Sequence, residues 1–250
     1  MNHIKALGFD LFNTLITVRP DALTAALERL TGSLGANDIA VDIGTFSRDH
    51  RRAAFRFIKA TRRDGRETHN RYWISAALKE QGYEVSPEDP RLAEAVDAYF
   101  SAFFDFSTLI PGTKAMLASL KQSYPLGLLS NFTHAPAAKT LLDNLGLSTF
   151  FDLILISGEV GYRKPHPFIF ERLSAGLGFS PEQIAYIGDD PEPDVEGAIN
   201  AGLQPIWMTY VRDMNIPFAP GVASEQAVGV DGGVPRISEW NELCALLGKG

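Results

Sequence analysis

The second half of the chain alternates short apolar runs with amphipathic segments, and this alternation restricts the fold more than any other feature. The apolar runs have the length of strands and lie at 124–130, 151–157, 184–189 and 205–210. Segments with helical periodicity separate them and lie at 135–145, 167–177 and 194–201. Strands and helices that alternate in this way form a parallel sheet with right-handed crossovers. We therefore predict an α/β fold with a doubly wound parallel sheet.

A further strand is predicted near the start of the chain. The apolar residues Ile4, Ala6, Leu7 and Phe9 are followed directly by Asp10. Such a run is typical of a buried strand, and open α/β sheets place their ligands at the carboxyl ends of the strands. An aspartate that only caps a turn after a core strand would give the same local pattern. Asp10 is therefore a candidate functional residue that needs support from elsewhere in the chain.

Helical periodicity replaces the strand signals between these two regions. The segment from 17 to 106 contains amphipathic runs separated by breakers at 32–37, 64–65 and 86–87. We predict a core domain formed by residues 1–16 and 107–250, with residues 17–106 as a helical cap domain. A long loop rich in Gly and Pro is expected at 212–235, followed by a closing helix.

The composition is that of an ordinary globular protein. The chain has 250 residues, of which 45% are hydrophobic and 21% charged, so it is long enough for one large core and a companion domain. Its formal net charge of −7 argues against binding nucleic acid with the whole surface. We see neither a signal sequence nor a membrane-spanning run, and the one cysteine, Cys244, can form no intramolecular disulfide. We predict a cytoplasmic protein without membrane or nucleic-acid partners; the sequence leaves the oligomeric state open.

Polar residues follow three of the later apolar runs. Ser130 and Asn131 end one run, Lys164 precedes a helix, and Asp189 and Asp194 follow another run. The carboxyl ends of parallel strands meet at one edge, so these side chains are expected to converge with Asp10. Gathered carboxylates repel each other unless a hard cation such as Mg²⁺ is bound between them. In such a site Lys164 could hold an anionic group, Ser130 could donate a hydrogen bond to it, and Asp10 could attack it.

The four stretches, in this order, resemble the four motifs of the haloacid-dehalogenase-like (HAD) hydrolase superfamily. The resemblance covers residues 4–210 and implies a Rossmann-like core with a type 1 helical cap at the position of the helical segment. It implies that Asp10 is the nucleophile that forms an aspartyl intermediate, with Ser130 and Lys164 as the other catalytic residues. The substrate contacts that it implies are Asn131 and Phe12. The Mg²⁺ ligands that it implies are Asp10, the backbone carbonyl of Phe12, Asp189 and Asp194.

One position departs from the motifs of the phosphatases in this superfamily. These enzymes usually carry a second aspartate two residues after the nucleophile, where this chain has Phe12. That aspartate protonates the leaving oxygen, which is worth roughly 10² to 10⁴ in rate. The dehalogenases carry an aromatic residue there, but their fourth motif binds no metal, whereas 188–190 (Gly-Asp-Asp) has the phosphatase form. We predict an Mg²⁺-dependent phosphatase of a small phosphorylated metabolite, with a 2-haloacid dehalogenase or a catalytically weakened binding or regulatory protein as alternatives.

The predicted cap contains a strongly basic stretch. Between 48 and 71 there are nine basic side chains and three acidic ones. A solvated helix face gives the same pattern, and so does a helix that directs one or two arginines towards the crevice to select an anionic substrate. Both interpretations stay open at this point.

Overall fold

The computed structural model describes residues 1, 3–217, 230 and 232–248. In this part of the chain, six strands form one parallel sheet in the order β5-β4-β1-β6-β7-β8. The strands are β1 (Ala6–Phe9), β4 (Leu126–Ser130), β5 (Leu153–Ile156), β6 (Ile184–Gly188), β7 (Gln204–Met208) and β8 (Arg236–Ile237). The predicted parallel sheet is confirmed.

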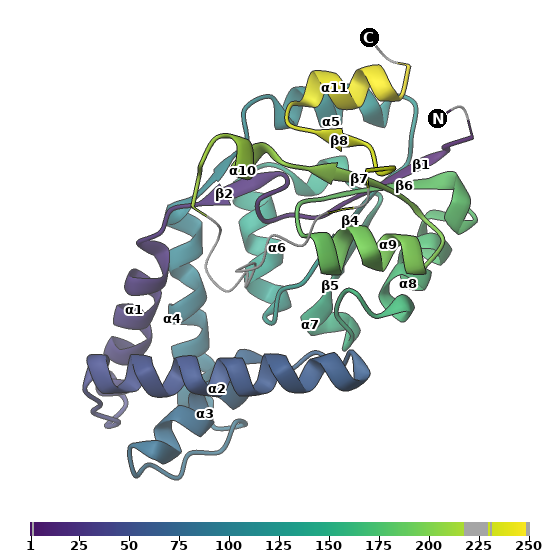
Figure 1. Ribbon diagram of the computed structural model, residues 1–250. Helices are drawn as coiled ribbons and strands as arrows, with labels where there is room; N and C mark the ends of the chain where they lie inside the picture. Colours follow the sequence, from purple (N-terminus) through teal and green to yellow (C-terminus); the bar gives the residue numbers. More distant parts are fainter. Residues whose placement is uncertain (2, 218–229, 231, 249–250) are drawn as a thin grey trace.

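Helices cover both faces of the sheet (Figure 1). The helices α5 (Thr113–Lys121) and α11 (Trp240–Leu246) pack against each other, and α8 (Pro167–Leu177) packs against α9 (Gly197–Asn200). The remaining helices of the core are α6 (Ala135–Asn144) and the one-turn helices α7 (Ser157–Val160) and α10 (Tyr210–Asp213). Because both faces are covered, β1, β4 and β6 are buried at every residue, which explains their continuous apolar sequences.

Residues 22–106 form four helices, which we call the helical insertion: α1 (Ala22–Ala36), α2 (Ile43–Asp64), α3 (Asn70–Glu80) and α4 (Pro90–Phe106). The long helix α2 lies across the molecule below the sheet in Figure 1. Asp42 begins α2 by accepting a hydrogen bond from the Thr45 backbone N–H, and Gly65 ends it with a φ of 68°. The all-helical content agrees with the periodicity of the sequence.

A two-stranded ribbon joins the insertion to the core, which the sequence analysis does not predict. The chain enters through β2 (Ile16–Val18) and leaves through β3 (Ser107–Leu109), and the two strands pair antiparallel. Strands of three residues are too short to show an alternating pattern, so periodicity could not reveal them. The ribbon sets both connections of the insertion side by side, close to the end of β1.

A predicted helix of the second half of the chain also differs in its bounds. The helix expected from 194 begins earlier, as a π-helix at Pro191–Glu196 that continues into α9. Its two prolines, Pro191 and Pro193, lie in the first turn, where the missing N–H costs no hydrogen bond. They therefore do not break the helix. Part of the loop expected at 212–235 lies outside the described residues. Among the described residues, no helix combines the length and the apolar character needed to cross a membrane.

Candidate active site

Asp10 lies directly after β1 and is almost completely buried. Its backbone N–H donates a hydrogen bond to the Ile187 carbonyl at 2.9 Å, which extends the pairing of β1 with β6 by one residue. One carboxylate oxygen, Oδ1, accepts a hydrogen bond from Lys164 Nζ at 2.7 Å. The other oxygen, Oδ2, lies 3.4 Å from the Thr14 hydroxyl, which donates towards it. The pairing with β6 therefore fixes the nucleophile predicted from the sequence at the centre of the sheet edge.

The Lys164 ammonium group joins three parts of the site. Besides Asp10, its Nζ donates to Asp194 Oδ1 at 2.6 Å and to the Tyr186 hydroxyl at 2.9 Å. Its backbone is held by the Asn131 amide, which donates to the Lys164 carbonyl at 3.0 Å and accepts from its N–H at 2.8 Å. Asn131, predicted as a substrate contact, thus uses its amide to brace Lys164.

Three carboxylates come together at this edge. Oxygen atoms of Asp10, Asp189 and Asp194 lie within 4.8 Å of one another, and all three residues are buried. Burial raises the pKa of Asp10 to about 7, with Lys164 opposing the shift and Asp194 adding to it. Burial also raises the pKa of Asp189 well above its usual range, and the neighbouring carboxylates act in the same direction. Burial and the mutual repulsion of the carboxylates thus both act to raise these pKa values.

The donor set of the cluster fits a hard divalent cation. Asp189 Oδ2 is buried without a hydrogen-bond partner among the described residues, which is costly unless a ligand is bound there. Asp194 has less capacity left, because its oxygens already accept hydrogen bonds from Lys164 and from the Asp190 N–H. Asp10 and Asp189 are thus the side chains best placed to hold Mg²⁺, and Asp194 holds Lys164 in place.

Ser130 lies at the end of β4, the strand beside β1. Its hydroxyl is buried and has no hydrogen-bond partner among the described residues. A hydroxyl in that state is free to donate to an anion in the site, as the sequence analysis predicts for it. The structure therefore brings Asp10, Lys164, Asp189 and Asp194 into one cluster, with Ser130 at the neighbouring strand end.

Phe12 takes part in an aromatic cluster. Its ring stacks on Phe132 with a centroid distance of 5.2 Å and an angle of 11°. It also meets Phe103 of α4 edge to face, with a centroid distance of 6.4 Å. Only 8% of Phe12 is exposed. The aromatic residue found in place of an acid–base carboxylate thus packs the core against the helical insertion.

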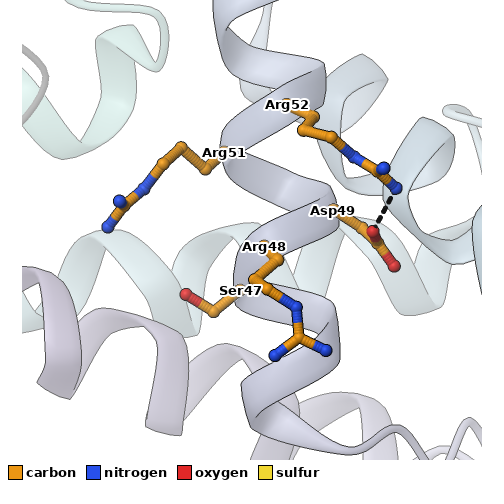
Figure 2. Close-up of a pocket in the computed structure, with 5 residues that line it drawn as sticks. All are labelled: Ser47, Arg48, Asp49, Arg51 and Arg52. Atoms are coloured by element: carbon orange, nitrogen blue, oxygen red, sulfur yellow. Dashed lines mark hydrogen bonds and ion pairs between the residues drawn. The ribbon is translucent and has the colours of Figure 1, made fainter.

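The basic stretch of the insertion lies mainly on α2. A cavity of about 400 Å³ lies on this helix. Figure 2 shows the residues that line it, Ser47, Arg48, Asp49, Arg51 and Arg52. Arg52 pairs with Asp49 at 2.5 Å, and Arg51 points to the opposite side of the helix. Further along α2, Arg62 pairs with Glu192 of the core at 3.3 Å, in the helix that follows Asp189. Arg62 is therefore an arginine of the basic stretch that reaches the edge of the site.

Several supporting residues were missed by the sequence analysis. Tyr186 binds Lys164, and the Trp207 indole N–H donates to the Asp189 carbonyl at 2.9 Å. His69 Nε2 lies 3.0 Å from His134 Nδ1, across the boundary between insertion and core. The one available signal was Tyr186 itself, a hydroxyl within an otherwise apolar strand.

The sequence matches the haloacid dehalogenase-like hydrolase family over residues 4–202. The chain belongs to this family. The match includes Asp10, Ser130, Lys164, Asp189 and Asp194, so it covers the cluster described above. The family of this hydrolase is therefore the one that the four sequence motifs indicated.

Two relatives are phosphatases. Ribulose-1,5-bisphosphate 5-phosphatase of Halopiger xanaduensis is 32% identical over 216 residues, which is 80% of this chain and 83% of that enzyme. Phosphoserine phosphatase of Thermus thermophilus is 37% identical over 133 residues, which is 53% of this chain and 51% of that enzyme. The second match thus spans only about half the length of that relative.

Two solved structures share the fold. A 2-haloacid dehalogenase from Pseudomonas syringae has a TM-score of 0.69 and 22% identity, covering 98% of this chain and 99% of that one. The HAD-hydrolase YfnB of Bacillus subtilis, bound to magnesium, has a TM-score of 0.64 and 23% identity over the same shares of both chains. The fold is therefore common to dehalogenases and to a magnesium-binding hydrolase.

Proposed function

We propose that this hydrolase is an Mg²⁺-dependent phosphatase of a small phosphorylated metabolite, acting through an aspartyl intermediate at Asp10. One observation carries the proposal: Lys164 binds the buried Asp10 carboxylate, and the two strands that flank β1 bring two buried groups to the same sheet edge, Asp189 Oδ2 and Ser130 Oγ, that have no hydrogen-bond partner among the described residues. The carboxylate oxygen can bind a cation, and the hydroxyl can donate to an anion. Because the nucleophile lies between the strand ends that carry them, the two groups suit a phosphate ester. The phosphatase relatives and the magnesium-bound YfnB support the same choice.

The chain's own residues supply most of the chemistry. The Asp10 carboxylate attacks phosphorus, and the phosphorus–oxygen ester bond breaks, so the leaving oxygen departs with the bonding electron pair. Water then hydrolyses the phosphoryl group on Asp10, which regenerates the carboxylate and releases phosphate. Ser130 donates a hydrogen bond to a phosphoryl oxygen, and the positive charge of Lys164, held beside Asp10, stabilises the negative charge there during both steps. Mg²⁺, held by Asp10, Asp189 and the Phe12 carbonyl, would offset the negative charge that gathers at the phosphoryl group.

Phe12 restricts the substrates that such a site can hydrolyse quickly. The chain has no carboxylate two residues after Asp10, so Phe12 cannot give a proton to an alkoxide leaving group. Acid–base help of this kind is worth roughly 10² to 10⁴ in rate. We expect aryl and acyl phosphates, whose leaving groups need no proton, to be hydrolysed much faster than alkyl phosphates.

A 2-haloacid dehalogenase is the second candidate, and Phe12 is the observation that favours it. A halide also leaves without a proton, so an aromatic side chain beside Asp10 does not slow its departure. Against this candidate, the buried Asp189 Oδ2, which has no hydrogen-bond partner among the described residues, has a clear physical use only with a cation. The two candidates therefore differ in leaving group and in metal dependence.

A substrate panel tests both candidates. Turnover of an aryl phosphate, an acyl phosphate, an alkyl phosphate and 2-chloropropionate would be measured with Mg²⁺ and after chelation, with Asp10→Asn as the inactive control. We expect Mg²⁺-dependent hydrolysis of the aryl and acyl phosphates. Dehalogenation that persists after chelation would replace the phosphatase proposal by the second candidate. Fast hydrolysis of the alkyl phosphate would show that another residue protonates the leaving group.

A further inference from the structure

Tyr186 places a hydroxyl group within hydrogen-bond distance of the catalytic lysine. It lies on β6, three residues before Asp189, and only 1% of it is exposed. Its oxygen is 2.9 Å from Lys164 Nζ and 3.0 Å from the Leu129 carbonyl. A lysine ammonium group can only donate, so the hydroxyl accepts from Lys164, and its own proton has the Leu129 carbonyl as the nearer acceptor and Asp194 Oδ1, at 3.4 Å, as the longer one. The direction of the hydrogen bond between Lys164 and Tyr186 is therefore determined.

This hydroxyl completes the set of partners of the ammonium group. Lys164 Nζ carries three protons, and among the described residues it has three acceptors, Asp10, Asp194 and Tyr186. With two acceptors the group could rotate and shift, whereas three acceptors fix its position. We propose that Tyr186 is a positioning residue for hydrolysis: it holds the Lys164 ammonium group against the nucleophile Asp10. The inference deepens the proposed function and rests on it.

The surrounding sequence makes room for this side chain. Gly8 of β1 pairs with Tyr186 in the sheet, and a Cβ atom at Gly8 would come within 2.8 Å of the tyrosine ring. The missing side chain lets the ring lie over β1, so that a hydroxyl from β6 reaches the carbonyl of Leu129 in β4. Phe170 of α8 packs edge to face against the ring, with a centroid distance of 5.2 Å. The ring is thus held on two sides, which aims the hydroxyl at Lys164.

The hydroxyl also connects the strands that carry the catalytic groups. Leu129 immediately precedes Ser130 on β4, while Asp189 follows β6. Because β4 and β6 flank β1, the hydrogen bond to Leu129 ties together the two strands on either side of Asp10. A buried tyrosine with a purely structural role would need only an acceptor for its hydroxyl proton, which Leu129 provides. The bond to Lys164 is what gives this hydroxyl a role in the reaction.

The test is the substitution Tyr186→Phe, which removes one oxygen and keeps the ring. We expect kcat to fall about tenfold or more, because small displacements of catalytic groups are costly, while KM changes less than about twofold. KM should change little because the hydroxyl acts through Lys164 and makes no contact with the substrate. A crystal structure of the variant should show Lys164 Nζ displaced from Asp10 or spread over more than one position.

Tyr83→Phe is the matched control. Tyr83, in the helical insertion, also donates its hydroxyl to a backbone carbonyl, that of Ala40 at 2.8 Å. Its variant loses the same kind of hydrogen bond and should keep the wild-type kcat. A role of Tyr186 in stability alone would lower the melting temperature and leave kcat unchanged.

The outcomes separate this inference from the proposed function. Wild-type protein that hydrolyses none of the phosphates refutes the phosphatase proposal, and the kinetic comparison then uses the haloacid if that is turned over. The crystal structure needs no substrate. Lys164 Nζ at its wild-type distance from Asp10 in Tyr186→Phe would overturn the positioning role, whatever the kinetics. An unchanged kcat with the substrate that the wild type uses would overturn it as well.

Discussion

At the scale of single residues, Phe12 affects both the chemistry of the site and the packing around it. Its position beside the nucleophile removes the acid–base carboxylate of related phosphatases, and its ring packs against Phe132 and Phe103. The second role depends on Phe103 in α4 of the insertion, about ninety residues away in sequence. A substitution at this position therefore changes the packing between insertion and core together with the chemistry.

We expect Phe12→Asp to destabilise the protein. It removes a buried aromatic side chain, which typically costs about 3 to 5 kcal/mol, and it places a carboxylate in an apolar cluster. The free energy of unfolding in urea should fall by about 3 kcal/mol or more. Phe55→Asp is the control, because Phe55 is 60% exposed and its replacement should cost within about 0.5 kcal/mol. Equal stability of both variants would show that the Phe12 ring contributes no packing.

At the scale of elements, the segment between α2 and α3 docks the insertion onto the core. The Ser157 hydroxyl donates to Glu67 Oε2 at 2.6 Å, and Arg66 pairs with Tyr162 in an antiparallel bridge. His69 then begins α3 and hydrogen-bonds His134 at the start of α6. Each contact joins residues that lie far apart in sequence, so tertiary packing alone brings them together.

The histidine contact should depend on pH. His69 Nδ1 accepts from the Arg71 N–H, so its Nε2 carries the proton that is donated to His134 Nδ1; His134 Nε2 in turn donates to Asp97. Burial, with His134 and Arg71 adding to it, lowers the pKa of His69 from 6.5 to about 4, and Asp97 opposes this. The unfolded chain therefore binds a proton at higher pH than the folded one, so this contribution to stability is complete above about 6.5 and declines as the pH falls towards 4.

The measurement is the melting temperature between about pH 7.5 and 4.5. His69→Gln cannot titrate, so its melting temperature should fall less than that of the wild type over this range. His3→Gln, at an exposed position, should follow the wild-type curve. Parallel curves for His69→Gln and the wild type would contradict the proposed pH dependence.

At the scale of the whole molecule, the site exists only when the fold is complete. Asp10 follows the first strand of the sheet, Lys164 precedes α8, and Asp189 follows β6, so the cluster spans most of the chain. The unfolded chain cannot gather these carboxylates. Binding of Mg²⁺ should therefore stabilise the protein as a whole by mass action.

We expect Mg²⁺ at about 100 times its dissociation constant to add about 2.7 kcal/mol, or about 5 to 10 °C in melting temperature for a chain of this size. Asp189→Asn should abolish this rise, since Asp189 supplies a buried oxygen that has no hydrogen-bond partner in the part of the chain that the structure describes. The exposed Asp105, which pairs with Arg29, offers the control Asp105→Asn, which should keep the rise. A wild-type melting temperature that does not respond to millimolar Mg²⁺ would refute the metal site.

Sequence alone was sufficient for the parallel sheet, for the family and for the candidates Asp10, Ser130, Lys164, Asp189 and Asp194. The reason is that these features depend on local periodicity and on the rule that parallel strands end at one edge. The roles of these residues, the division into core and cap and the cytoplasmic location stay predictions.

Tertiary structure decided how these residues act on one another. Asp194 holds Lys164, the Asn131 amide braces the Lys164 backbone, and Phe12 packs against the insertion. The hydroxyl of Tyr186 could not be assigned from sequence, because its partners, Leu129 and Lys164, lie 57 and 22 positions away. Such contacts depend on which strands are neighbours and on the space that Gly8 leaves between them, and both follow from the packing of the whole chain.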